Sequence, residues 1–171
     1  MKRIGLISDT HGYFPERLYH FFGNVDEIWH AGDIGSPELS DELGRFKPLK
    51  AVYGNIDGNV IRSCWPQHQR FMCEETSVWM THIGGYPGNY DRSVKPGIFQ
   101  NPPKLFISGH SHILKVIYDS KLGLLHLNPG AAGIYGFHKV QTALRFVIDG
   151  EDIREMEIWQ VERSGKVHMG D

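Results

Sequence analysis

The sequence has little cysteine. Only Cys64 and Cys73 occur among its 171 residues, and they form no motif with each other or with the histidines. We therefore expect neither a disulfide scaffold nor a structural zinc site built on thiolates. Cysteine used in this way fits a reducing compartment, so the sequence predicts a cytoplasmic protein.

Long apolar runs and an excess of positive charge are also lacking. No stretch approaches the roughly eighteen apolar residues of a membrane-spanning helix, and the first three residues lead into an apolar segment without a cleavable leader pattern. Lysine and arginine number 18 against 20 acidic residues, for a formal net charge of -2. Because nucleic-acid binders normally carry a basic surface, we expect neither a nucleic acid nor a membrane as a partner.

What the sequence does have is histidine, ten in all, several of them directly after apolar runs. The apolar segment 4–7 is typical of a buried strand, and Asp9 and His11 follow it. One residue separates the two, so on extended backbone both side chains would point to the same side. An acid and a histidine at the end of a strand indicate either a metal site or an acid/base pair.

Strands and helices alternate in the first third of the chain. Apolar runs predict strands at 28–31 and 49–53, and helical spacing predicts helices at 15–22 and from Ser36 onward. This alternation is typical of a parallel sheet with right-handed crossovers.

Beyond residue 70 the pattern favours strands. We expect a hairpin over 70–81 and a long loop over 86–103 that includes one helical turn. Residues 1–163 are predicted to form one domain and 164–171 a frayed tail. The remaining predicted strands are 104–108, 115–118, 122–127, 142–148 and 153–161.

Polar side chains also follow the later strands. Asp33 and Asn55 follow the second and third strands, and three histidines follow later ones, namely His82, His110 and His112. Ligands of open α/β sheets bind outside the carboxyl ends of the strands, so we expect these side chains to meet Asp9 and His11 at one edge.

This set of side chains fits two metal ions. It offers two carboxylates, four imidazoles and one amide oxygen, and one bridging carboxylate would give each ion four protein ligands. Mixed oxygen and imidazole ligation suits Mn, Fe, Zn, Ni or Co rather than calcium. Pairs of such ions, roughly 3.5–4 Å apart, are a recurrent device for phosphoryl transfer.

Each of these residues also has a plainer explanation when taken alone. Asp9 and Asp33 are common turn residues, and Asn55 is of a type that accepts left-handed backbone. His110 and His112 would form an ordinary hydrogen-bonded pair. Their order along the chain makes the metal interpretation the stronger one.

That order resembles a known family. The motifs Asp-x-His (9–11), Gly-Asp (32–33), Gly-Asn-x-Asp (54–57), Thr-His (81–82) and Gly-His-Ser-His (109–112) are similar to those of the calcineurin-like metallophosphoesterase superfamily. The Ser-Asp-Thr-His-Gly and Asn-Pro-Gly (128–130) elements most resemble its small prokaryotic YfcE-type phosphodiesterase branch. The resemblance covers about residues 2–149.

The resemblance implies a fold and a reaction. The implied fold is a four-layer α/β/β/α sandwich of two mixed sheets flanked by helices. The implied activity is hydrolysis of a small phosphate ester, a diester rather than a monoester, by a hydroxide that bridges two divalent ions. The ions would be Mn, Ni, Fe or Zn, with Mn favoured, and relatives in this branch are often homo-oligomers.

The resemblance also assigns roles to individual residues. It implies that Asp9, His11 and His112 hold the first ion and that Asn55, His82 and His110 hold the second. Asp33 would bridge the two ions, and the catalytic residues would be Asp33, Asn55 and His82.

Two positions depart from the family pattern. Many members have histidine or cysteine at the position of Ile56 and a second histidine at that of Gly84. A residue that would protonate the leaving group is therefore missing, which predicts slow or selective turnover. The alternative is a weakly active or inactive metal-binding or protein-interaction module of the same fold, similar in scale to the small retromer subunit. A metal-loaded nucleotide sensor is a third option.

Other polar residues are expected to play supporting roles. Asp57 is predicted to shape a turn near the ligands, and His30 and His126 to be packed or hydrogen-bonded within strands. His138 and Lys139, in a loop that follows a glycine, are predicted to be solvated surface residues.

Overall fold

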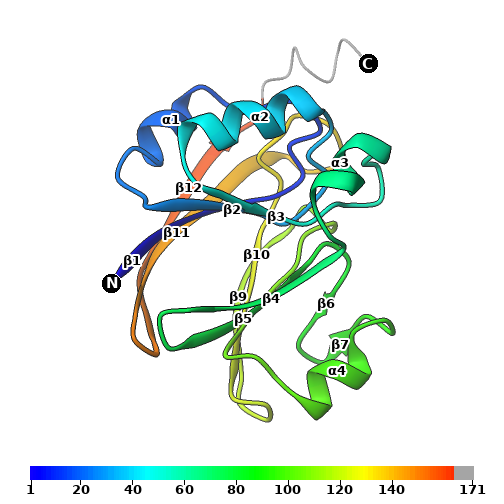
Figure 1. Ribbon diagram of the computed structural model, residues 1–171, viewed down its shortest axis with the longest axis vertical. Helices are drawn as coiled ribbons and strands as arrows, with labels where there is room; N and C mark the ends of the chain where they lie inside the picture. The colour runs from blue at the N-terminus through cyan, green and yellow to red at the C-terminus, as the bar shows by residue number, and fades with distance from the viewer. Residues whose placement is uncertain (164–171) are drawn as a thin grey trace.

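The computed structural model describes residues 1–163, and it shows two five-stranded β-sheets packed face to face with helices on both outer faces (Figure 1). The predicted frayed tail, 164–171, lies outside the described residues.

The first sheet is mixed and has the order β12-β11-β1-β2-β3. Strands β1, β2 and β3 are parallel to one another, and the two long carboxy-terminal strands, β11 and β12, are antiparallel to their neighbours. Two helices form the crossovers between the parallel strands, and a third follows the last of them. The bounds are β1 (Lys2–Ile7), α1 (Arg17–Phe21), β2 (Glu27–His30), α2 (Pro37–Phe46), β3 (Leu49–Ala51), α3 (Asn59–Cys64), β11 (Val140–Asp149) and β12 (Asp152–Glu162).

The second sheet is also mixed and has the order β4-β5-β8-β10-β9. Strands β5, β8 and β10 are parallel, whereas β4 and β9 pair antiparallel at the two edges. A short hairpin and a helix are inserted between β5 and β8. The bounds are β4 (His68–Cys73), β5 (Thr76–Thr81), β6 (Gly85–Tyr86), β7 (Asn89–Tyr90), α4 (Lys95–Gln100), β8 (Leu105–Ile107), β9 (Leu114–Asp119) and β10 (Leu124–Pro129).

Three apolar clusters show how these elements stack. On β1, Ile4 and Leu6 face the second sheet, where they join Met80 and Ile107 in the central core. Ile7 belongs instead to a second cluster, with side chains of α1, α2 and α3. The alternation of side chains along a strand explains why β1 is buried on both faces.

A third cluster lies between the second sheet and α4, and it contains Trp79, Val94, Ile98 and Phe106. The layers therefore run from helices α1–α3 through the first sheet and the second sheet to α4 (Figure 1). The predicted four-layer α/β/β/α sandwich is confirmed.

Three local details differ from the prediction. The first helix begins at Arg17 rather than at residue 15, helix α3 was not predicted, and the expected loop 86–103 contains the end of a hairpin and helix α4. Helix α3 buries only Ile61 and starts after Gly58 without a side-chain cap. A helix this short leaves too weak an apolar period to be detected in the sequence.

Candidate metal centre

The loops that follow the parallel strands meet at one end of the sandwich. The Asp9 amide donates to the Gly32 carbonyl (3.0 Å), and the Gly109 amide donates to the His82 carbonyl (2.9 Å). The His110 amide then joins the two sheets, because it donates to Asp9 Oδ2 at 3.0 Å. Backbone contacts therefore bring the predicted strand ends together, as the sheet topology requires.

Five of the seven predicted ligand residues have left-handed backbone. Their φ angles are 55° for Asp9, 47° for His11, 58° for Asp33, 74° for His110 and 62° for His112. The assumption of extended backbone for Asp9 and His11 is therefore wrong, and tight turns aim these side chains instead. Each such turn costs about 1–3 kcal/mol in a non-glycine residue, and strain of this kind gathers at functional sites.

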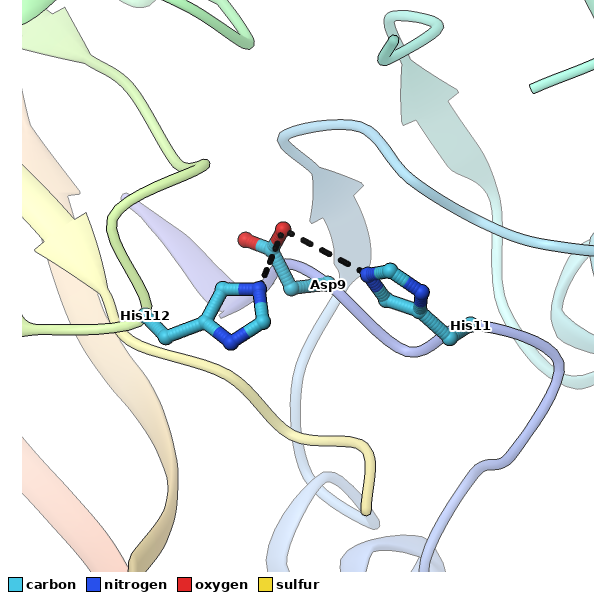
Figure 2. A group of neighbouring side chains, drawn as sticks. All are labelled: Asp9, His11 and His112. Carbon is cyan, nitrogen blue, oxygen red and sulfur yellow. Dashed lines mark ion pairs between the residues drawn. The ribbon is translucent and has the colours of Figure 1, made fainter. Parts of the chain in front are cut away.

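The first group of side chains consists of Asp9, His11 and His112. Asp9 Oδ1 lies 3.2 Å from His112 Nε2 and 3.9 Å from His11 Nε2. Figure 2 shows both imidazole rings directed at the Asp9 carboxylate from opposite sides. This is the trio that the family resemblance assigns to the first ion.

The second group consists of Asp33, His82 and His110, with Asn55 beside it. Asp33 Oδ2 lies 3.1 Å from His82 Nε2 and 3.4 Å from His11 Nε2, so this oxygen stands between the two groups. His110 Nδ1 lies 3.1 Å from Asn55 Oδ1. All seven predicted ligand residues therefore lie in one cluster.

Buried polar atoms in this cluster lack partners. Asp9 Oδ1, His11 Nε2 and His82 Nε2 are buried and make no well-aligned hydrogen bond with any of residues 1–163. Each unsatisfied buried group costs about 1–3 kcal/mol. Three such atoms converge on one point, and their carboxylate and imidazole chemistry fits a borderline divalent cation.

The electrostatics of the cluster also favour a bound cation. Burial opposes ionisation of the Asp9 carboxyl, but His11 and His112 beside it hold its pKa well below its usual range. The carboxylates of Asp33 and Asp9 raise the pKa of His11 to about 9. The negative potential that favours a proton on His11 also favours a metal ion, so the two cations compete for this site.

Hydrogen bonds set which nitrogen of two imidazoles faces the cluster. His82 Nδ1 donates to the Ala31 carbonyl at 2.7 Å, so its Nε2 lone pair points toward Asp33. His138 Nε2 donates to the Gly133 carbonyl at 2.8 Å, and the Nδ1 of neutral His138 accepts from His112 Nδ1 at 3.0 Å. The Nε2 lone pair of His112 therefore faces Asp9.

The prediction that His138 is a solvated surface residue is wrong. Its side chain is buried, and burial lowers its pKa, which favours the neutral ring that the hydrogen bonds require. Histidine 138 lies 26 residues from His112, and no local pattern in the sequence signals their contact.

Asp57 fixes the backbone of two loops that carry ligand residues. Its carboxylate accepts hydrogen bonds from the amides of Ile34 (3.1 Å), Gly35 (2.9 Å) and Gly54 (2.8 Å). These bonds tie the loop of Asp33 to the loop of Asn55. The prediction that Asp57 shapes a turn near the ligands is confirmed.

His30 and His126 are buried and hydrogen-bonded, as predicted. His30 Nε2 contacts Thr10 Oγ1 at 2.8 Å, and His126 Nδ1 contacts the Phe106 carbonyl at 3.1 Å. Burial lowers the pKa of each ring to about 4, so both are neutral at pH 7.

The two atypical positions carry no proton donor in a side chain. Ile56 is an exposed aliphatic residue. A Cβ atom at Gly84 would lie 2.6 Å from the Phe106 ring, so no larger residue fits there without a shift in the core.

Two cavities border the cluster. The Asn55 cavity, of about 430 Å³, is lined by residues that include Tyr53, Asn55, Arg62 and His82. The Lys115 cavity, of about 340 Å³, is lined by residues that include Tyr86, Arg92, Lys95, His110, Ser111 and Lys115. The two cavities share Ile83 and Asp91 in their walls, so they lie next to each other beside the second group of side chains.

A family model agrees with the motifs and with this geometry. Residues 1–151 match the model of the calcineurin-like phosphoesterase superfamily domain. The chain belongs to the calcineurin-like phosphoesterase superfamily. A superfamily relative, described as a probable metallophosphoesterase of Methanothermobacter thermautotrophicus, is 32% identical over 135 residues, which cover 75% of this chain and 76% of that protein. A phosphodiesterase of Methanocaldococcus jannaschii is 25% identical over 146 residues, which cover 75% of this chain and 82% of that protein.

Solved structures with the same fold include Vps29 proteins and a phosphodiesterase. Vps29 of Entamoeba histolytica in complex with Zn²⁺ has a TM-score of 0.73 at 17% identity, with 95% of this chain and 99% of that chain covered. An archaeal phosphodiesterase has a TM-score of 0.69 at 20% identity, with 92% and 99% covered. Identities this low establish the fold alone. Within residues 1–163, no helix is both long and apolar enough to cross a membrane.

Proposed function

We propose that this phosphoesterase holds two divalent ions and hydrolyses small phosphodiesters. The observation that carries the proposal is the position of Asp33 Oδ2, within 3.1–3.4 Å of an imidazole nitrogen from each group of side chains. An oxygen placed in this way suits a ligand shared by two ions. Asp9, His11 and His112 would complete the first site, and Asn55, His82 and His110 the second.

When bound, the ion pair supplies Lewis acidity and lowers the pKa of water so that hydrolysis proceeds at neutral pH. The side chains of the protein position the ligand atoms. Asp33 would be shared by the two sites, and its other oxygen is held by the Ile56 amide at 3.1 Å. Asn55 and His82 line the Asn55 cavity, so they would contact both a bound ion and a substrate group in that cavity. We assign the catalytic roles to these three residues.

The two neighbouring cavities support a diester substrate. A phosphodiester has two organic groups on phosphorus, and two cavities border the cluster that could each take one of them. A monoester would need only one. Mixed oxygen and imidazole ligands without a thiolate suit Mn, Ni, Fe or Zn, and manganese, which the family resemblance favours, is the ion that we propose.

The test combines metal content with turnover. The purified protein is analysed for bound metal and then assayed with bis-p-nitrophenyl phosphate and p-nitrophenyl phosphate in added Mn²⁺. We expect about two equivalents of metal and faster cleavage of the diester. Asp33→Asn should lower both quantities, whereas Asp41→Asn, an exposed aspartate on α2, should change neither. A stoichiometry near one, or a faster monoester reaction, would contradict the proposal.

The lack of a proton donor at Ile56 and Gly84 makes a second prediction about the same reaction. Without a general acid, the rate should depend steeply on the pKa of the leaving group, because general acid catalysis contributes about a hundredfold or more. The measurement is kcat for a series of aryl phosphodiesters. A flat dependence would mean that another group protonates the leaving oxygen.

A second candidate function has its own support. The fold is similar to that of Vps29, and the two atypical positions remove polar groups from the centre. The chain would then be a metal-binding module that contacts another protein. Bound metal without any turnover would favour this function or that of a nucleotide sensor. Protein association that is unchanged in Asp33→Asn would favour the interaction module.

We also propose that residues 1–163 act as one domain in the cytoplasm, with a small phosphate ester as partner and self-association into a homo-oligomer. All three apolar clusters lie within this range and contact shared strands, which supports a single folding unit.

A further inference from the structure

We infer that the Lys115 cavity binds a second phosphate group of the substrate, so that the preferred substrates are phosphodiesters that carry an additional phosphate. The inference rests on the proposed function and adds the substrate class. Its evidence is the wall, the charge and the hydrogen-bonding capacity of this cavity.

The wall of the cavity is fixed by hydrogen bonds. Ser108 Oγ donates to the Gly85 carbonyl at 3.0 Å, and the Asp91 amide donates to the Gly84 carbonyl at 3.0 Å. Tyr90, at the end of β7, anchors the hairpin through a 2.7 Å hydrogen bond from its hydroxyl to Asp119. In Figure 1 the β6–β7 hairpin lies beside α4 at the margin of the second sheet. A fixed wall lowers the entropic cost of ligand binding.

Three cations line the cavity, namely Arg92, Lys95 and Lys115. None of the three forms an ion pair with a carboxylate of the described chain, whereas Lys2 and Lys50 both pair with Glu27. The one acidic lining residue, Asp91, already accepts hydrogen bonds from the Ser93 amide (2.9 Å) and hydroxyl (2.6 Å). Three cations against this one carboxylate leave the cavity with an excess of positive charge.

Ser111 adds a hydrogen-bond donor. Its Oγ accepts from the Asn128 side-chain amide at 3.1 Å and from the Ile113 amide at 3.2 Å. Both bonds use the oxygen as acceptor, so the hydroxyl proton remains to be donated, and no acceptor for it lies among residues 1–163. A hydroxyl donor beside unpaired lysine and arginine suits phosphate oxygens.

The Asn55 cavity differs from the Lys115 cavity in its free donors. Arg62 lines the Asn55 cavity, but its guanidinium donates to the backbone carbonyls of Asp57 (2.6 Å), Gly54 (3.4 Å) and Asn55 (3.3 Å). Its Nε and Nη2 donors are thus engaged within the protein. His110 belongs to the second group of metal-site residues and also lines the Lys115 cavity, so an anion there would be adjacent to the reacting phosphoryl group.

The test is binding of phosphates to the Mn²⁺-loaded protein by isothermal titration calorimetry. Thymidine 3′,5′-bisphosphate is compared with thymidine 5′-monophosphate, and pyrophosphate with phosphate. The two compounds with two phosphates differ in the distance between these groups, so a long and a short separation are both tested. We expect at least one bisphosphate to bind about tenfold more tightly than its monophosphate counterpart, as one charge-assisted contact would provide. The double variant Arg92→Gln/Lys115→Gln should reduce that ratio to about twofold or less.

The matched control is Lys104→Gln/Lys121→Gln, which removes two lysines outside the cavity and should leave the ratio unchanged. Equal affinity for mono- and bisphosphates at both spans, or a preference that survives Arg92→Gln/Lys115→Gln, would overturn the inference. The outcome is separable from that of the proposed function. Diester hydrolysis without a bisphosphate preference refutes the inference alone, and a preference without hydrolysis refutes the proposed activity alone.

Discussion

The two sides of the metal centre differ in how firmly their side chains are held. Asp9, Asp33 and His82 are 0–2% exposed, and each has a hydrogen-bond partner that fixes its orientation. Asn55 and His110 are exposed, and their side chains contact each other. The centre thus has a rigid buried side and an adaptable open side, and the open side borders both cavities. We take this to mean that the buried side determines metal affinity and the open side determines how substrate enters.

The largest effect should come from a change on the buried side. Asp9→Ala removes the acceptor for the Ser8 hydroxyl and the His110 amide as well as one carboxylate of the first group. Loss of several kcal/mol of metal-based stabilisation predicts about a thousandfold lower kcat. Elemental analysis should also show less than one equivalent of retained metal.

His110→Ala on the open side is the matched comparison. It should retain at least one equivalent of metal and lose about a hundredfold in kcat, because the ring's only side-chain hydrogen bond within residues 1–163 is with Asn55. If both variants lose metal to the same extent, the distinction between the two sides is wrong.

A smaller effect is expected for His138. His138→Phe removes the acceptor that sets the tautomer of His112 and should weaken Mn²⁺ affinity about 10- to 100-fold, measured by calorimetry. His138→Gln offers an amide oxygen as acceptor and should restore most of that affinity. Nitrogen chemical shifts of His112 should report the change of tautomer in the Phe variant. Equal loss in both variants would mean that His138 only fills space.

The smallest effect concerns pH. In the metal-free protein, Asp33 and Asp9 raise the pKa of His11 to about 9, above its unfolded value of about 6.5. The resulting stability is fully present below pH 6.5 and is lost as the pH rises through 9. Thermal unfolding in chelator should therefore show a falling Tm between these values. His11→Gln should flatten this slope, and His20→Gln, on the exposed part of α1, should not.

The rigid side was largely predictable from sequence, since each of its residues follows an apolar run. Asp9, Asp33 and His82 follow β1, β2 and β5, and parallel strands bring their carboxyl ends to one edge. The contacts that orient these side chains and form the cavity wall could not be predicted from sequence. The contact between His138 and His112, and the cavity wall formed by β6 and β7, depend on tertiary contacts that leave no periodic pattern in the chain. Left-handed turns at the ligands were missed because Asp and His are not restricted to such turns.

The close approach of Gly84 to Phe106 restricts how this protein can change over generations. The Phe106 ring is wedged among Trp79, Tyr90 and His126, with ring centroids 5.4–5.8 Å apart. A histidine at position 84 would meet that ring before it reached the metal centre. A lineage that gained a proton donor there would have to accept a smaller residue at 106. A donor at position 84 would thus require a compensating change in the core, and a smaller residue at 106 would cost stability.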